Sequence, residues 1–360
     1  MSAKNVTPTD FKNTSVPAGS KEKFLVHVGE LATGSPLGIP VWVIAGKRPG
    51  PTVYVGAGVH GEEPAGMAAV ANAARKLDPK DVRGTIIAAP IVNPGAWAFR
   101  GRHFPLDAPN VGDVASIAKG DPGGIMSERV VSAVVDHITA TVEMALDVHA
   151  THLDSINYPR AMVTITGAEP EEVQKKRLEM GRAVGYEVVH LWKRPGHGGG
   201  VTGQLNRRGV PTIAIEAGEG WRALDPWVAI LERGVTNFLK FTGNLDGEPE
   251  MPPVQVEVTA RFEITANRGG MSFVKTRPGD FVREGQVVAE IRDGWGETIE
   301  ELRSPWNGII IRTSVLPTVA SGARVCNVYQ TEQTDFESWN RRKLPALEAQ
   351  IRIPGLPVAS

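Results

Sequence analysis

The sequence has very little cysteine: Cys326 is the only one among 360 residues. A single cysteine excludes an intramolecular disulfide framework and any zinc or iron–sulfur site built from several cysteines. The chain does contain 8 histidines and 40 acidic residues. These residues leave open one kind of metal site, in which histidine and carboxylate ligands hold the ion.

The chain also lacks an excess of charge, long apolar runs and a secretory signal. Its 39 basic and 40 acidic residues give a net charge of −1, so nothing suggests a nucleic acid or an anionic membrane as a partner. No stretch approaches the roughly 18 apolar residues of a membrane-spanning helix, and the N-terminus has no apolar signal core. We therefore expect a cytoplasmic protein. The sequence does not decide whether the chain forms a homo-oligomer through sheet edges or through its C-terminal β region.

Hydrophobic residues make up 41% of the chain and charged residues 22%, which is the composition of an ordinary globular protein. The length predicts two domains, or one large domain with an appendage. Proline and acidic residues at 246–254 are typical of a linker between domains. The expected segments are an N-terminal arm or early edge strand (1–24), a large domain (25–245), a C-terminal β domain (246–330) and a tail packing back on the body (331–360).

Hydrophobic patterning predicts the fold class. Apolar runs typical of buried strands, such as 84–92, 143–150 and 210–218, alternate with helical patterns such as 62–77 and 225–241. This alternation predicts an α/β fold with a mostly parallel, mixed sheet flanked by helices. Beyond the linker, short strand-like runs between glycine turns predict a small all-β domain.

The first candidate site follows the strand-like run PTVYVGAGV. His60 comes directly after this run and Glu63 comes three residues later, where a helix begins. Both side chains can therefore face one centre, at the sheet edge where α/β proteins place their sites. With 8 histidines, however, about one such pair is expected by chance. The pair needs support from elsewhere in the chain.

Two further apolar strands supply that support. His149 ends the strand-like run EMALDVHA, and Glu216 lies near the end of VPTIAIEAG. A buried carboxylate costs free energy unless it is paired or lies at a cleft. Two histidines and one carboxylate are a common catalytic zinc set with a coordination position left for water, and a fourth, unligated carboxylate can serve as general base. A histidine buried in the core and bonded to a backbone carbonyl is the alternative for either imidazole.

At these residues the chain resembles the succinylglutamate desuccinylase/aspartoacylase family, a branch of the zinc carboxypeptidase-like hydrolases. The resemblance covers roughly residues 25–330. The matching segments are VHGEEPAG, APIVNPGAWAFRGRHFPLD, GDPGGIMSER, LDVHA and VPTIAIEAG, followed in the C-terminal domain by RPGDFVREGQVVAEI and RSPWNGIIIRTSVLPTVASG.

The resemblance implies a role for each strand-end residue. His60, Glu63 and His149 would bind one Zn²⁺ per chain. Glu216 matches the family's base, which takes a proton from the attacking water and passes it to the leaving amine. The implied activity is metal-dependent hydrolysis of the amide bond of a small N-acyl amino acid or related amide, which makes the chain a deacylase.

An arginine follows Asn93-Pro94 in the matched segment. The family has an arginine nine residues after this asparagine, where it polarises the scissile carbonyl. That position is Arg102 here, and Arg100 is the alternative. A fixed guanidinium beside the developing oxyanion lowers the barrier by about 3 kcal/mol, whereas the plain alternative for either arginine is a solvated charge on a loop.

The substrate-binding segment departs from the family pattern. The family usually reads Asp-Gly-x-Asn-Leu-Asn-Arg, whose Asn-Arg pair binds the substrate carboxylate. Asp107 and Asn110 are retained here as substrate-binding candidates, but Gly112-Asp113 stands near the place of Asn-Arg. An aspartate there would repel a carboxylate and could attract an ammonium or a polar neutral group. We therefore expect a substrate other than the acidic N-acyl amino acids.

Two nearby residues have weaker signals. His152 could contact the substrate or be an ordinary loop histidine. Asp147 lies two residues before His149 and so on the same strand face, where it could orient that imidazole or pair with an arginine. Two other functions stay open: a metallocarboxypeptidase acting on peptides, and a non-catalytic binding protein on a decayed hydrolase fold.

Overall fold

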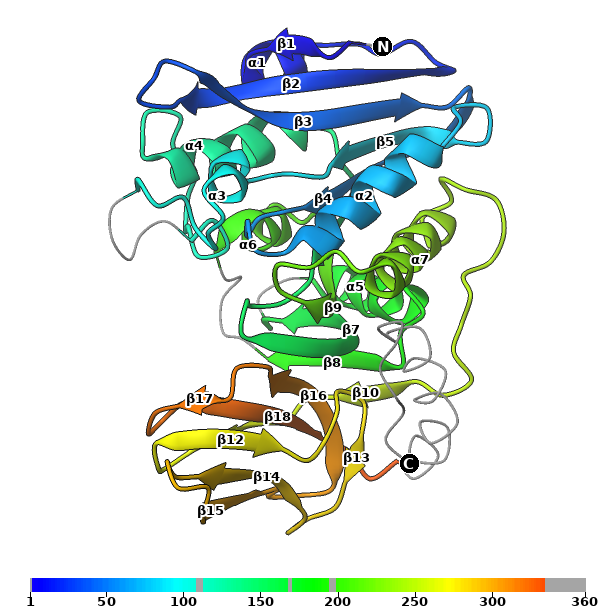
Figure 1. Ribbon diagram of the computed structural model, residues 1–360. Helices are drawn as coiled ribbons and strands as arrows, with labels where there is room; N and C mark the ends of the chain where they lie inside the picture. Colours follow the sequence, from blue (N-terminus) through cyan, green and yellow to red (C-terminus); the bar gives the residue numbers. More distant parts are fainter. Residues whose placement is uncertain (1, 108–112, 168–169, 194–198, 334–360) are drawn as a thin grey trace.

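A computed structural model describes residues 2–107, 113–167, 170–193 and 199–333. A long twisted sheet runs the length of the molecule, with helices on both faces of its first part and further strands at the C-terminal end (Figure 1). The predicted mixed α/β sheet with a strand-rich C-terminal region is confirmed. Asn110 and nearly all of the predicted tail lie outside the described residues. No helix within the described ranges is long and apolar enough to cross a membrane.

The main sheet has the order β1-β2-β3-β5-β4-β6-β9-β7-β16-β18-β11. Its strands in the first part of the chain are β1 (Lys4–Val6), β2 (Ser20–Glu30), β3 (Pro36–Ala45), β4 (Arg48–Ala57), β5 (Arg83–Ala89), β6 (Met144–His149), β7 (Ser155–Ile165), β8 (Val188–Lys193) and β9 (Thr212–Glu219). The central strands β5, β4, β6 and β9 run parallel. Their carboxyl ends therefore meet at one edge, which is where α/β sheets place their ligands.

Helices cover both faces of the parallel strands. They are α1 (Pro8–Lys12), α2 (Pro64–Lys76), α3 (Pro94–Ala98), α4 (Met126–Ser132), the π-helix η1 (Ala133–Ile138), α5 (Glu171–Ala183), α6 (Gly200–Arg207) and α7 (Asp225–Phe241). A hydrophobic cluster joins α2, α5 and α7 to one face, and a second cluster joins α1, α4, η1 and α6 to the other. The predicted helix at 225–241 has the bounds of α7.

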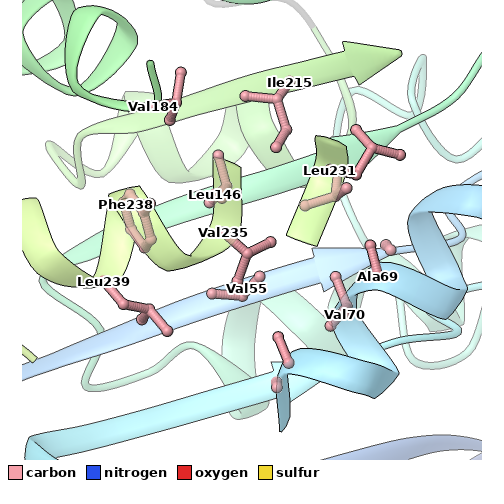
Figure 2. Close-up of a cluster of buried hydrophobic side chains, with 14 of the residues drawn as sticks. Val55, Ala69, Val70, Leu146, Val184, Ile215, Leu231, Val235, Phe238 and Leu239 are labelled. Atoms are coloured by element: carbon pink, nitrogen blue, oxygen red, sulfur yellow. The ribbon is translucent and has the colours of Figure 1, made fainter. Parts of the chain in front are cut away.

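The cluster under α7 shows why this helix packs where it does. Leu231, Val235 and Phe238 repeat at helical spacing and are buried. They lie over Leu146 of β6 and Ile215 of β9 (Figure 2). The strands carrying these two side chains also carry His149 and Glu216, so the packing of α7 fixes the scaffold of the candidate site.

The C-terminal strands divide between the main sheet and a second, smaller sheet. They are β10 (Val256–Val258), β11 (Arg261–Thr265), β12 (Gly270–Val274), β13 (Phe281–Val282), β14 (Val287–Arg292), β15 (Thr298–Arg303), β16 (Gly308–Ser314), β17 (Thr318–Val319) and β18 (Arg324–Gln330). Strand β16 pairs with β7, and β10 pairs with β8. Strands β15-β14-β12-β17 form a second, four-stranded sheet over a separate hydrophobic cluster. We propose that 25–245 and 246–330 are the two units of the chain.

The sequence patterns did not indicate β7, β8 or α6. Strand β7 contains Asn157, Pro159 and Arg160 within its apolar run, and these residues interrupt a simple strand pattern. Helix α6 begins at the last glycine of the run GHGGG, and such a run is typical of a loop. Near the N-terminus, β1 is an edge strand parallel to β2, and the side chain of Phe11 in α1 is buried against Phe24.

Replacing Leu231 with alanine should lower the free energy of unfolding by about 2–5 kcal/mol, because Leu231 is fully buried between α7 and the sheet. Urea unfolding followed by circular dichroism measures the change. Leu316→Ala is the matched control, since the Leu316 side chain is 46% exposed. Equal losses in the two variants would contradict this assignment of the core.

Candidate active site

Three chain segments bring ionisable side chains to the carboxyl edge of the parallel strands. His60 and Glu63 lie between the end of β4 and the start of α2. His149 is the last residue of β6, and Glu216 stands directly beside it on β9 as its register partner. Partners on neighbouring strands point to the same face of a sheet. The structure therefore brings together the four residues that the sequence placed at this edge.

Glu63 lies at the centre of the cluster and is almost fully buried. Its Oε1 is 2.7 Å from His60 Nδ1, and its Oε2 is 2.8 Å from His149 Nδ1. The backbone N–H of Ala150 also donates to Oε2, at 3.1 Å. Burial alone would raise the pKa of Glu63, but the two imidazoles hold it well below its usual range.

Each imidazole has a second acidic neighbour on its other ring nitrogen. His60 Nε2 lies 3.3 Å from Asp113 Oδ1, and His149 Nε2 lies 3.1 Å from Asp147 Oδ2. Burial alone would lower the pKa of both histidines. The carboxylates beside them, Glu63 with Asp113 or Asp147, raise it instead. A cation that enters this cluster must therefore displace protons from the histidines.

The cluster fits a zinc ion by its donor chemistry. Ligand atoms of His60, Glu63 and His149 all lie within 4.8 Å of one another. Two imidazole nitrogens and a carboxylate oxygen are a common catalytic zinc set. In such sites a ligating histidine usually donates its other ring N–H to a carboxylate or carbonyl, and Asp113 and Asp147 stand at those positions.

Two polar residues of β7 hold Glu216 in place. Asn157 Nδ2 donates a hydrogen bond to Oε1 at 2.9 Å, and Arg160 Nη2 donates to Oε2. The Arg160 side chain is buried and stands opposite Glu216 in the β7–β9 ladder. Glu216 thus has a fixed orientation beside His149. The side chains of Glu216, His60, Glu63 and His149 line one cavity.

Arg102 lies beside the cluster, and Arg100 does not. Arg102 Nη1 donates to Glu62 Oε1 at 2.9 Å and to Glu63 Oε1 at 3.3 Å, and its side chain lines the cavity. Arg100 is exposed, adopts a positive φ of 54° and is not among the described cavity residues. Of the two arginines considered from the sequence, the geometry favours Arg102.

Asp107, a substrate-binding candidate from the sequence, lies at a helix end in the structure. Its carboxylate accepts hydrogen bonds from the backbone N–H groups of Met126 and Ser127, at 2.9 and 3.0 Å, and so caps the first turn of α4. It is not among the described cavity residues. His152 does line the cavity, and its Nδ1 lies 3.4 Å from Glu62 Oε1.

The cavity has a volume of about 360 Å³, which suits a small molecule. One end contains the cluster around Glu63, together with Asp113 and the start of α6. The other end is formed by β7, β8 and the C-terminal strands β11, β16 and β18. Both units of the chain therefore contribute side chains to the same space.

Parallel strands with two histidines and a carboxylate at their carboxyl ends are typical of metal-dependent hydrolases. The family comparison is more specific, because the model of the succinylglutamate desuccinylase/aspartoacylase catalytic domain matches residues 49–242. The chain belongs to this family, whose known members cleave amide bonds.

Individual relatives agree with this assignment. N-alpha-acetyl-L-2,4-diaminobutyric acid deacetylase of Halomonas elongata is 28% identical over 290 residues, which cover 79% of this chain and 82% of that protein. A succinylglutamate desuccinylase/aspartoacylase from Rhodobacter sphaeroides has a TM-score of 0.79 at 24% identity, with 89% of this chain and 98% of that chain covered. The product-bound ectoine utilization protein EutE from Ruegeria pomeroyi has a TM-score of 0.78 at 21% identity, with 88% of this chain and 98% of that chain covered. The two structures show the shared fold.

Sequence reasoning missed several side chains of the site. Glu62, Asn157 and Arg160 hold Arg102 or Glu216, and arginines of the C-terminal strands line the cavity. A charged residue within the apolar run NYPRAMVTI was the available signal for Arg160. No local signal could pair β7 with β16, because that contact joins residues far apart in the sequence.

The protein loaded with zinc and then dialysed should retain about one zinc ion per chain, and His149→Ala should lose it, because one of only three ligands is removed. Metal content by plasma mass spectrometry checks this. His27→Ala, which removes an exposed imidazole of β2, should retain the metal. Zinc loss in the His27 variant, or retention in the His149 variant, would contradict the assigned ligands.

Proposed function

We propose that the protein is a zinc-dependent deacylase that hydrolyses the amide bond of a small N-acyl amino acid. The observation that supports this best is the placement of the His60–Glu63–His149 cluster, Glu216 and Arg102 around one small cavity. The Halomonas relative, by its name, removes an acetyl group from an amino acid.

His60, Glu63 and His149 would hold the zinc ion. When bound, zinc supplies a Lewis acid that polarises the scissile carbonyl and acidifies water. The buried positions of Glu63 and His60, with Asp113 and Asp147 behind the imidazoles, hold the three ligand groups in a fixed arrangement.

Glu216 is the proposed general base. It stands beside His149 in the β6–β9 ladder, and hydrogen bonds from Asn157 and Arg160 fix its carboxylate. In this role Glu216 takes one proton from the water that attacks the amide carbon. It then gives that proton to the nitrogen as the carbon–nitrogen bond breaks, which releases an amine and a carboxylic acid, and the acid loses its proton to water or the amine at neutral pH.

Arg102 is the proposed oxyanion partner. Its Nη1 is anchored by Glu62 and Glu63, so the guanidinium is held beside the cluster before the substrate arrives. A pre-positioned donor of this kind stabilises the developing negative charge by about 3 kcal/mol. Glu62 is buried beneath Arg102 and His152, so its carboxylate is a fixed anchor for the partly exposed guanidinium.

Asp113 bears on which amino acid is accepted. It lines the cavity beside His60, close to where family members carry the Asn-Arg pair. Burial alone would raise its pKa, but His60 and the backbone N–H of Ala115 hold the pKa well below its usual range, so Asp113 is negatively charged at neutral pH. An acidic substrate side chain would meet repulsion there, and an amine would meet attraction. A diaminobutyric acid derivative, as in the Halomonas relative's name, carries such an amine.

Glu216→Gln should lower kcat by about 10²–10⁴-fold, because the carboxamide cannot accept the proton of water. Acetate release from Nα-acetyl-L-2,4-diaminobutyrate measures the rate, and zinc content is measured on the same samples. The control is Glu257→Gln, which alters a carboxylate of β10 paired with Arg182 and should retain the wild-type rate. A zinc-loaded Glu216 variant with full activity would refute the assigned base.

A substrate panel should show the effect of Asp113. We expect kcat/KM to be higher for Nα-acetyl-L-2,4-diaminobutyrate and Nα-acetyl-L-ornithine than for N-acetyl-L-aspartate and N-succinyl-L-glutamate. Asp113→Asn should narrow this gap by about tenfold or more, since a charged hydrogen-bond partner is lost. If the acidic compounds prove the best substrates, the proposed role of Asp113 is wrong.

A further inference from the structure

The cavity continues from the proposed metal ligands onto the C-terminal strands. Arg312 of β16 stands in register with Asn157 of β7 on one side and with Asn327 of β18 on the other, and Asn327 is in turn the partner of Glu263 on β11. All four residues line the cavity. A row of polar side chains therefore crosses four neighbouring strands, beginning beside the asparagine that holds Glu216.

This end of the cavity carries an excess of positive charge. Arg261 and Arg324 line the cavity and share a single carboxylate, Glu263, at 3.9 and 3.4 Å from its Oε1. Arg312 pairs with Asp154 at 2.8 Å, and Arg160 pairs with Glu216. Glu263 balances only one of the two arginines beside it, whereas Arg312 and Arg160 each have a carboxylate of their own. These four arginines and three carboxylates together have a net charge of +1.

Two of these guanidinium groups have N–H donors that make no hydrogen bond within the described residues. Arg160 and Arg312 are almost fully buried. Each uses Nη2 for its carboxylate, while Nε and Nη1 are buried without a hydrogen-bond partner among the described residues. Buried N–H donors of a charged group are costly when unpaired. An anion that enters this end of the cavity would find donors already ordered around it.

The neighbouring histidine adds no charge of its own. His190 of β8 lines the same end, and burial together with Arg160 and Arg261 lowers its pKa to about 3. It is therefore neutral near pH 7, and the attraction for an anion comes from the arginines. Arg261 also lies over the Trp192 ring, 5.5 Å from its centroid, which restricts its position.

We propose that Arg261, Arg312 and Arg324 of the C-terminal strands form the subsite that binds the α-carboxylate of the substrate amino acid. This inference rests on the proposed deacylase function. It explains how a chain with Asp113 near the place of the family's Asn-Arg pair still binds a carboxylate: the cation is supplied from the opposite end of the cavity, by strands that β16 joins to the catalytic sheet. Guanidinium groups suit this role because they bind carboxylates through two parallel hydrogen bonds.

The test compares Nα-acetyl-L-2,4-diaminobutyrate with its neutral α-carboxamide. Wild-type enzyme should have a KM about tenfold or more lower for the carboxylate, as expected for a charge-assisted hydrogen bond. Arg324→Gln and Arg261→Gln should remove most of this ratio by raising KM for the carboxylate far more than for the carboxamide, with a smaller effect on kcat. The side chains of Arg261 and Arg324 are partly exposed, so both variants should fold. Arg312→Gln is not used, because it removes a buried partner of Asp154 and could prevent folding.

Arg303→Gln is the matched control. Arg303 also pairs with a carboxylate in the C-terminal unit, Glu301, but lies outside the described cavity lining. The Arg303→Gln variant should therefore retain the wild-type ratio of the KM values for the carboxamide and the carboxylate. A ratio unchanged in both Arg261 and Arg324 variants would overturn the subsite. A preference for succinyl over acetyl substrates that these variants abolish would place the acyl-chain carboxylate there instead and would also overturn it.

Calorimetric binding of L-2,4-diaminobutyrate and its carboxamide to zinc-loaded protein separates this inference from the proposed function. Binding that favours the carboxylate and depends on Arg324, in a protein that cleaves none of the N-acyl amino acids, would support the subsite and refute the deacylase. Turnover without any preference for the carboxylate would refute the subsite and leave the deacylase standing.

Discussion

The buried carboxylate of Glu63 is the interaction on which the site depends. A carboxylate removed from water is unfavourable unless it is paired, and Glu63 is paired with both His60 and His149. These histidines come from two different strand ends, so Glu63 ties β4 to β6 at the edge of the sheet. Behind them, Asp113 and Asp147 extend the arrangement on both sides. Such a cluster of ionisable groups is costly to bury without a ligand and well suited to bind a cation.

The second constraint is the continuity of the sheet. Because β16 pairs with β7 and β10 pairs with β8, the C-terminal unit adds strands to the sheet that carries Glu216 rather than resting on it as a separate body. A small cluster that includes Tyr158, Ile309 and Tyr329 fills the junction. The cavity consequently has an acidic end near the proposed metal ligands and a basic end on the C-terminal strands, which suits an amino acid carrying both charges.

The sequence predicted the parts of the fold that depend on local pattern. Helix α7 and the parallel strands β4, β6 and β9 follow from periodicity, and the strand ends predicted that His60, His149 and Glu216 would meet. What it missed depends on long-range pairing. Asn157 and Arg312 come together only through the β7–β16 register, which no local pattern encodes. Asp107 fits a substrate-binding motif, and its capping of α4 is a contact with residues 19 and 20 positions further along the chain, which the motif does not encode.

We propose above all that His60, Glu63 and His149 form the metal site of a hydrolase. An anomalous difference map at the zinc absorption edge, from crystals of the zinc-loaded protein, tests it most directly. We expect one strong peak bounded by the imidazoles of His60 and His149 and the carboxylate of Glu63, with Glu216 close by but not among the ligands. A peak held by other residues, or Glu216 bound directly to the metal, would contradict it.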